Sequence, residues 1–209
     1  MIANEFRAWL VDLDGTLYVQ RPVRWAMACE LLMFGWPALR VVTQFRREQE
    51  ALRREPLGGD EPAADSSVPY DLQINRTASR LKIPREQVLS LMETWMQRRP
   101  GKWLWLFRRR RLLAEITQFR RQGGKTALVS DYPAAAKLAA LRAETLVDVV
   151  VANGEPGGPS HLKPSPQGFL LAAARLGISP QQCLVIGDRD DADGQAAQRA
   201  GMTFRKIAS

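Results

Sequence analysis

Residues 10–17 read Leu10-Val11-Asp12-Leu13-Asp14-Gly15-Thr16-Leu17, an apolar run that ends on two carboxylates and turns on a glycine. The apolar residues predict a buried strand from Phe6 to Val11. Residues i and i+2 of a strand point the same way, so Asp12 and Asp14 are expected to project from its carboxyl end into one crevice. Two carboxylates so close together repel each other, and a bound cation would offset this repulsion. The alternative is a polar strand end or an aspartate that caps a helix.

The length and composition predict an ordinary globular chain. Its 209 residues, 45% hydrophobic and 25% charged, can form one domain with an insertion. No stretch approaches the roughly 20 apolar residues of a membrane span, and the N-terminus lacks the pattern of a signal peptide, so we expect a cytoplasmic protein. Cys29 and Cys183 lack metal-ligand spacing and are expected to be buried small hydrophobes. The single histidine, His161, cannot support a histidine-rich metal site.

The positive charge is concentrated in one block of the chain. The formal net charge is +8, and residues 19–125 hold 21 Lys and Arg against 11 Asp and Glu. The rest of the chain holds 9 against 11. This asymmetry predicts that the block meets an anionic partner, which is a phosphorylated substrate, nucleic acid or an acidic membrane surface.

Outside this block, strand and helix patterns alternate along the chain. The predicted strands are residues 6–11, 126–130, 146–152, 183–187 and 203–207, and the predicted helices are 133–143, 166–176 and 193–200. Near-continuous apolar strands alternating with helices indicate an α/β fold with a doubly wound parallel sheet.

The block between the first two strands has a helical texture. Apolar residues recur at helical spacing from Val88 to Met96 and from Leu112 to Phe119. Another apolar helix is predicted from Val23, with a break at Gly35-Trp36-Pro37. Residues 55–69, rich in Pro, Gly, Asp and Ser, predict an exposed and disordered loop. We therefore expect a core of residues 1–18 and 123–209 and a mainly helical insertion of residues 19–122.

Polar residues follow several of the predicted strands. Ser130 ends the second strand, Lys163 precedes Pro164, and Asp188 follows the strand that ends at Gly187. The carboxyl ends of parallel strands share one edge, so these residues should meet Asp12 there. Transfer of a phosphoryl group requires a hard divalent cation and hydrogen-bond donors to the phosphoryl oxygens. Asp12, Asp188 and a backbone carbonyl could hold the cation, and Lys163 and Ser130 could be the donors. Lys163 is the only fixed cation expected close to these carboxylates.

The arrangement resembles the haloacid dehalogenase-like superfamily, in its phosphatase branch with a helical cap. Its four motifs appear in order: Asp12-Leu-Asp14-Gly-Thr16, the hydroxyl of Ser130, Lys163 in Lys-Pro-Ser-Pro, and Gly187-Asp188 with a further acid at Asp193. The resemblance covers about half of the residues directly. It implies a Rossmann-like core, an inserted helical cap and Mg²⁺ as the cofactor.

The resemblance also implies a role for each motif residue. Asp12 would be the nucleophile that forms an aspartyl-phosphate, and would ligate Mg²⁺. Asp14 would bind the metal through its backbone carbonyl, protonate the leaving oxygen and then activate water. Ser130 and Lys163 would hold the phosphoryl group, and Asp188 would complete the metal site.

Two residues compete for the second acid of the last motif. In this family that acid acts through water or by orienting the motif lysine. Asp193 matches the spacing best, and Asp191 is the rival.

Asp14 favours one activity within the family. Haloacid dehalogenases lack an acid at this position, because a halide leaves unprotonated. An alkoxide leaving group needs a proton, so Asp14 favours hydrolysis of a phosphate ester over dehalogenation.

A basic, aromatic stretch from Arg98 to Arg111 departs from the usual cap pattern. The plain interpretation is a cap helix that packs on the core with solvated arginines. A second interpretation is an interfacial patch on anionic lipid. Nucleic acid is the third, although no known nucleic-acid-binding motif is present.

The function that the sequence favours is a Mg²⁺-dependent phosphatase acting on a phosphate monoester, either a phosphorylated small molecule or a lipid phosphate. The first alternative is phosphotransfer to a second position of the substrate, as in related mutases. The second is a non-catalytic binding protein whose basic cap holds anionic lipid or nucleic acid.

Overall fold

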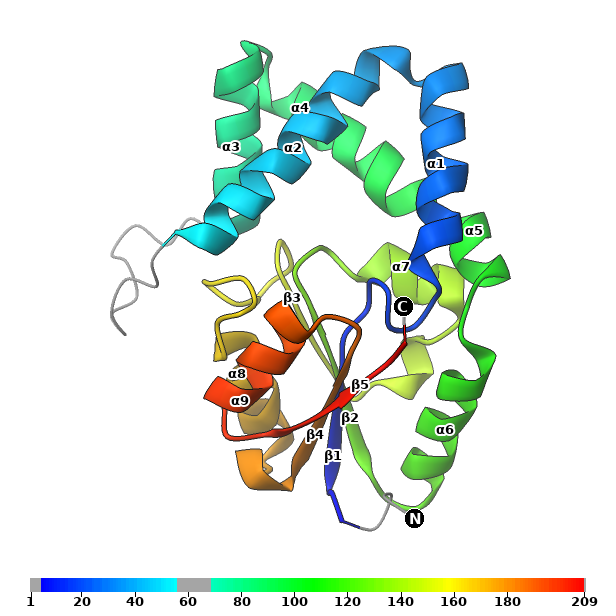
Figure 1. Ribbon diagram of the computed structural model, residues 1–209, viewed down its shortest axis with the longest axis vertical. Coiled ribbons are helices and arrows are strands. Elements are labelled where there is room, and N and C mark those ends of the chain that lie inside the picture. Colours follow the sequence, from blue (N-terminus) through cyan, green and yellow to red (C-terminus); the bar gives the residue numbers. More distant parts are fainter. Residues whose placement is uncertain (1–4, 56–68, 209) are drawn as a thin grey trace.

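The computed structural model describes residues 5–55 and 69–208. One part of the molecule is a parallel sheet with helices on both faces, and the other is a layer of helices above the sheet (Figure 1). The helical layer is inserted between the first two strands of the sheet. The loop predicted over residues 55–69 lies almost wholly outside the described residues.

Five strands form one parallel sheet. They are β1 (Ala8–Val11), β2 (Lys125–Ser130), β3 (Val149–Ala152), β4 (Cys183–Gly187) and β5 (Thr203–Lys206), in the order β3-β2-β1-β4-β5. Every pairing is parallel, so the predicted α/β, doubly wound fold is confirmed. β1 lies at the centre of the sheet, which places its carboxyl end at the middle of the edge where ligands bind.

Helices cover both faces of the sheet because the strands are apolar on both sides. Trp9 and Val11 pack with α6 (Arg110–Arg121) and α7 (Ala135–Leu141), and the Trp9 ring stacks on Phe119 at 4.3 Å between centroids. Ala8 and Leu10 pack with α8 (Gln167–Leu176) and α9 (Gln195–Arg199). The alternation of side chains along β1 therefore feeds two separate cores.

Most elements differ from the sequence prediction by one to three residues at an end, as β1 does by beginning at Ala8 rather than Phe6. β3 begins at Val149 rather than residue 146, because a 3₁₀ turn occupies Glu144–Leu146. The helix expected over 193–200 is preceded by a π-helical turn, Asp190–Gly194, and continues as α9. π-helical turns are frequent at functional sites, and this one carries Asp193.

The helical insertion consists of α1 (Gln20–Phe34), α2 (Trp36–Arg54), α3 (Pro69–Leu81), α4 (Arg85–Met92), a π-helical turn (Glu93–Arg98) and α5 (Gly101–Leu106). It has an apolar core of its own, which includes Phe45, Ile74, Val88 and Met92. The exact division of the chain at residues 18 and 122 stays a prediction.

The corner between α1 and α2 confirms the break predicted at Gly35. A Cβ atom on Gly35 would lie 2.2 Å from the Cζ2 atom of Trp95, which is closer than packed atoms approach. The missing side chain therefore lets the Trp95 ring pack directly against the corner. Trp95 is buried there, and it also lines the cavities described below.

The two cysteines differ in burial. Cys183 is buried in β4, as expected, but Cys29 is exposed on α1, so the prediction for Cys29 was wrong. The helical spacing from Val23 placed α1 correctly but did not show which of its faces packs on α2. Among residues 5–55 and 69–208, no helix is both long and apolar enough to cross a membrane.

The basic stretch from Arg98 to Arg111 makes several contacts within the protein. Glu30 on α1 accepts a hydrogen bond from Trp103 Nε1 at 2.7 Å and pairs with Lys102 at 2.8 Å. Arg109 donates to the backbone carbonyls of Gly15 at 3.3 Å and Ala208 at 2.6 Å. These contacts favour the interpretation of this stretch as part of the folded surface.

Candidate active site

The site is built on the turn that follows β1. The Asp12 N–H donates to Ile186 O at 2.9 Å, which ties the strand end to β4. Gly15 has φ +100°, and a Cβ atom there would lie 2.2 Å from Asp188 Oδ2. The turn needs glycine for both reasons, the left-handed backbone and the close approach of Asp188. Thr16 Oγ1 donates back to Asp12 Oδ2 at 3.0 Å and orients the carboxylate.

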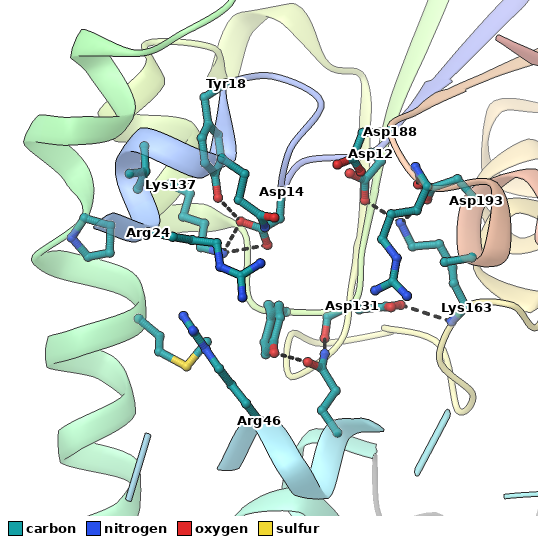
Figure 2. Close-up of a pocket in the computed structure, with 18 of the residues that line it drawn as sticks. Asp12, Asp14, Tyr18, Arg24, Arg46, Asp131, Lys137, Lys163, Asp188 and Asp193 are labelled. Atoms are coloured by element: carbon teal, nitrogen blue, oxygen red, sulfur yellow. Dashed lines mark hydrogen bonds and ion pairs between the residues drawn. The ribbon is translucent and has the colours of Figure 1, made fainter. Parts of the chain in front are cut away.

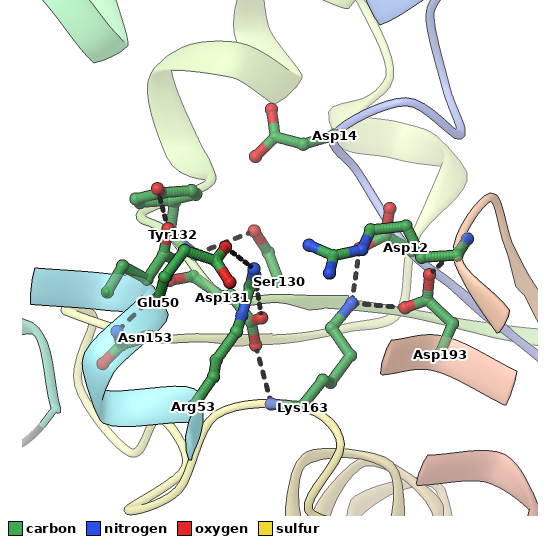
Figure 3. Close-up of polar contacts among 12 residues, drawn as sticks. Asp12, Asp14, Glu50, Arg53, Ser130, Asp131, Tyr132, Asn153, Lys163 and Asp193 are labelled. Carbon is green, nitrogen blue, oxygen red and sulfur yellow. Dashed lines mark hydrogen bonds and ion pairs between the residues drawn. The ribbon is translucent and has the colours of Figure 1, made fainter. Parts of the chain in front are cut away.

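A buried lysine lies between two carboxylates at the sheet edge. Lys163 Nζ contacts Asp12 Oδ1, Asp193 Oδ1 at 2.7 Å and Val129 O at 3.3 Å (Figure 3). Burial alone would lower the pKa of Lys163, but the charges of Asp12 and Asp193 outweigh burial and raise it. The lysine therefore stays charged and holds Asp12 in a fixed orientation.

The rival acid Asp191 lies elsewhere. Its carboxylate is exposed and accepts from Arg189 Nε at 3.1 Å and from an Arg189 terminal nitrogen at 2.6 Å. Of the two acids suggested by the motif spacing, the structure brings Asp193 and not Asp191 to Lys163.

Three carboxylates form a candidate metal centre. Oxygen atoms of Asp12, Asp188 and Asp193 all lie within 4.8 Å of one another. Asp188 Oδ1 is buried without a hydrogen-bond partner in the part of the chain that the structure describes. Burial raises the pKa of Asp12 to about 8 against the opposing charge of Lys163, and burial followed by the Asp193 charge raises the pKa of Asp188. This all-oxygen, charge-crowded set fits a hard divalent cation such as Mg²⁺.

Asp14 faces a second lysine that the sequence analysis missed. Lys137 Nζ contacts Asp14 Oδ1 at 2.6 Å and Oδ2 at 2.7 Å, and Tyr18 donates its hydroxyl hydrogen to Asp14 Oδ1 (Figure 2). Burial alone would raise the pKa of Asp14, but Lys137 outweighs it and holds that pKa below its usual value. The prediction that Lys163 is the only fixed cation beside the carboxylates was therefore wrong.

A signal for Lys137 existed in the sequence. It is the one charged residue within Pro133-Ala134-Ala135-Ala136-Lys137-Leu138-Ala139-Ala140, at the start of the helix that follows the second strand. A buried lysine needs a carboxylate, and the helix begins at the sheet edge where the carboxylates lie. Nothing comparable in the sequence indicated that Tyr18 would contact Asp14.

At the end of β2, the sequence analysis named Ser130 but missed the next residue, Asp131. Ser130 is buried and accepts from the Tyr132 N–H at 3.2 Å, but it does not line the cavity described below. Its neighbour Asp131 does line it and pairs with Arg53 of α2 at 2.7 Å (Figure 3). Asp131 Oδ1 also accepts from the Lys163 N–H at 3.1 Å. Asp131 therefore joins the helical insertion to the loop that carries Lys163.

The site opens into a cavity of about 300 Å³ between the sheet edge and the helical insertion. Asp12, Asp14 and Lys163 line it from the sheet. Figure 2 shows the side chains of Arg24 on α1 and Arg46 on α2 on the opposite side. A small anion bound in this cavity would lie near a lysine and carboxylates at the sheet edge and near arginines on the helices.

Comparisons with known proteins agree with this geometry. A family model for haloacid dehalogenase-like hydrolases matches residues 6–201. A glyceraldehyde 3-phosphate phosphatase of Methanopyrus kandleri is 47% identical over 45 residues, which are 22% of this chain and 19% of that protein. The fructose-1-phosphate phosphatase YqaB of Escherichia coli is 45% identical over 69 residues, or 33% of this chain and 35% of that protein. The matches thus span about a third or less of these relatives.

The fold has counterparts among solved structures. The β-phosphoglucomutase of Clostridium difficile superposes with a TM-score of 0.63 and 16% identity, over 98% of this chain and 85% of that chain. At this identity the likeness concerns the fold alone. It extends over the sheet and the helical insertion together.

Proposed function

The chain belongs to the haloacid dehalogenase-like hydrolase family, and we propose that it is a Mg²⁺-dependent phosphatase that hydrolyses a phosphate monoester. One observation carries the proposal. The Asp12 carboxylate ends the central strand, is held by Lys163, and lies beside the carboxylates of Asp188 and Asp193. A nucleophile, a fixed cation and a set of metal ligands thus share one edge.

In the proposed first step, Asp12 attacks the phosphorus atom of the ester. The bond from the Asp12 carboxylate oxygen to phosphorus forms as the bond to the ester oxygen breaks, which leaves an aspartyl-phosphate and an alcohol. Lys163 neutralises the charge on the phosphoryl oxygens, and the Ser130 hydroxyl at the end of β2 is proposed as a further donor to them. Asp14 enters this step protonated, gives its proton to the departing oxygen and is left as a carboxylate.

In the proposed second step, water hydrolyses the aspartyl-phosphate. Asp14 takes a proton from the water as its oxygen bonds to phosphorus, and the bond to Asp12 breaks to release phosphate. The first step leaves Asp14 as a carboxylate, and Lys137, which holds the pKa of Asp14 low, stabilises that charge until Asp14 acts as this base. Tyr18 and Lys137 act as positioning residues, since both contact Asp14 itself.

Asp12, Asp188 and the backbone carbonyl of Asp14 would hold the Mg²⁺ ion, which supplies charge neutralisation for the nucleophile and the phosphoryl group. Asp193 would orient Lys163, which it contacts directly, and would reach the metal through water. The unpartnered Asp188 Oδ1 atom supports this assignment.

We propose the helical insertion, α1 to α5, as the cap that covers the site and contacts the alcohol part of the substrate. Arg24, Arg46 and Arg53 bring positive charge from α1 and α2 to the cavity. This accounts for the basic block of the sequence through an anionic substrate. Exclusion of water by such a cap strengthens the electrostatic contacts inside.

Phosphate release from a panel of monoesters tests the proposal. The panel includes fructose 1-phosphate and glyceraldehyde 3-phosphate, the substrates named for the two relatives, and simple alkyl phosphates. We expect release that requires MgCl₂ and stops with EDTA. Binding of the esters without turnover would support a non-catalytic role, and an isomerised sugar phosphate without free phosphate would support a mutase.

A further inference from the structure

We infer that the substrate is a phosphate monoester whose alcohol carries an extended apolar chain, and that this chain lies in a trough between α1 and α2. The inference rests on the proposed phosphatase function and adds the substrate class. The phosphate would lie at Asp12 and Lys163, and the chain would extend away from the sheet into the helical insertion.

The trough is the larger of the two neighbouring cavities. Its volume is about 680 Å³, within the range of small-molecule sites, and it has an apolar lining. The lining residues include Met27, Leu31 and Leu32 of α1, Leu39 and Val42 of α2, and Trp95 of the π-helical turn. The cavity above the carboxylates, at about 300 Å³, cannot hold a long chain by itself.

The trough adjoins the catalytic cavity. Arg24, Met27, Arg46, Glu50 and Trp95 line both of them. A ligand with its phosphate at the sheet edge can therefore extend past these residues into the trough.

The charges around the trough fit an amphiphilic anion. Arg24, Arg46, Arg47 and Arg54 line it, against one acid, Glu50. The aliphatic stem of an arginine adds to an apolar lining, while its guanidinium group attracts a phosphate. Arg24 and Arg46 lie at the junction, since both also line the catalytic cavity, whereas Arg47 and Arg54 line the trough alone.

The same lining disfavours a polar alcohol in the trough. The polar residues of the lining are Thr43, Glu50 and the four arginines; hydroxyl groups of a sugar that lie against the other side chains, such as Leu31 and Val42, find no hydrogen-bond partner. An unpaired hydroxyl in an apolar site costs affinity. An alkyl or isoprenoid chain loses nothing and gains from leaving water.

A series of n-alkyl phosphates from ethyl to dodecyl tests the inference, with each ester kept below its critical micelle concentration. We expect kcat/KM in the wild type to rise by up to about fourfold for each added methylene until the trough is filled. A second arm presents dodecyl phosphate in phosphatidylcholine vesicles. A higher rate from the dissolved ester identifies a soluble amphiphile, and a higher rate from vesicles identifies a membrane lipid phosphate.

A matched pair of variants locates the effect. Ala28 is exposed and lines the trough, so Ala28→Trp should fill it and bring the dodecyl-to-ethyl ratio of kcat/KM close to one. Cys29→Trp adds the same ring at the next exposed position, outside the trough lining, and should keep the wild-type ratio. Thr43→Trp places the ring from α2 and repeats the test if Ala28→Trp does not fold.

Each result decides between named alternatives. A flat wild-type series with phosphate released from every ester would overturn the inference and leave the proposed function standing. Release from the sugar phosphates of the first panel but from no alkyl ester would overturn the inference alone, and release from no ester of either panel would overturn the proposed function as well. A wild-type dimer that Ala28→Trp converts to a monomer, seen by light scattering, would show that a second copy covers the trough and would also overturn the inference.

Discussion

The charged side chains at the sheet edge are paired with one another, whereas, in the part of the chain that the structure describes, two arginines on the facing helices are not. At the sheet edge, Lys163 pairs with Asp12 and Asp193, and Lys137 pairs with Asp14. On the helices, Arg24 and Arg46 line the same cavity without an ion-pair partner within residues 5–55 and 69–208. The edge is thus organised before any substrate arrives, whereas the helices leave positive charge for a ligand to neutralise. The difference separates the machinery of the reaction from the surface that selects the substrate.

The largest expected effect on activity comes from replacing the proposed nucleophile at the sheet edge. Asp12→Asn keeps the side-chain shape but removes the nucleophile and weakens a metal ligand, so phosphate release should fall by more than about 10⁴-fold. Phosphate release with Mg²⁺ measures the effect, and circular dichroism serves as the control for folding. Activity above about one per cent of the wild type in a folded variant would contradict the role of Asp12.

The next effect concerns the charge balance of the edge. Lys163→Met leaves the buried carboxylates of Asp12 and Asp193 without their cation, which should lower the free energy of unfolding by about 3–5 kcal/mol in the absence of metal. Because Mg²⁺ can replace part of the lost charge, MgCl₂ should raise the melting temperature more in Lys163→Met than in the wild type. Equal shifts in the two proteins would show that the metal does not bind at these carboxylates.

Lys137→Met tests whether each carboxylate depends on its own lysine. Since Lys137 holds the pKa of Asp14 low, its removal should raise that pKa and move the acidic limb of the kcat–pH profile to higher pH. We expect kcat to fall by about 10- to 100-fold because Asp14 also loses its orientation.

The control for this variant is Lys125→Met, because Lys125 is exposed at the start of β2, away from the site. It should leave the pH profile unchanged. A Lys137→Met profile identical to the wild type would remove Lys137 from the proposed mechanism.

The smallest effect is expected on the helical side, at the α1–α2 corner. Gly35→Ala forces a methyl group against the Trp95 ring and should destabilise the protein by about 1–3 kcal/mol. In a Trp95→Leu background the same change should cost less, because the ring is gone. Urea unfolding of the four proteins measures the coupling, and equal costs in both backgrounds would show that the ring does not limit the corner.

Much of the sheet edge could be predicted from the sequence. Asp12 and Asp188 follow apolar strands directly, so the strand pattern places them at the carboxyl ends of parallel strands. The structure shows that these two strands are neighbours. Lys163 lies on a loop and Asp193 in the π-helical turn Asp190–Gly194, and the resemblance of their motifs to the family placed both at the same edge. The break at Gly35 was predictable because glycine and proline act locally on the backbone.

The partners of these residues were not predictable in the same way. Lys137, Tyr18, Arg53 and Asp131 come from α7, the turn after β1, α2 and the end of β2, and their pairing depends on how these elements pack. The exposure of Cys29 and the apolar trough depend on the angle between α1 and α2. Periodicity names the apolar face of a helix but not the neighbour that the face meets.

The sequence by itself determined the parallel sheet, the strand that leads into Asp12 and Asp14, and the helical nature of the insertion. These features follow from local periodicity and from the short range of strand and turn preferences. Only the tertiary structure decided which lysine meets which aspartate, which acid turns toward Lys163, and where an apolar trough opens beside the site. Such contacts join residues far apart in the chain, and their geometry is set by the packing of whole elements, which no local pattern encodes.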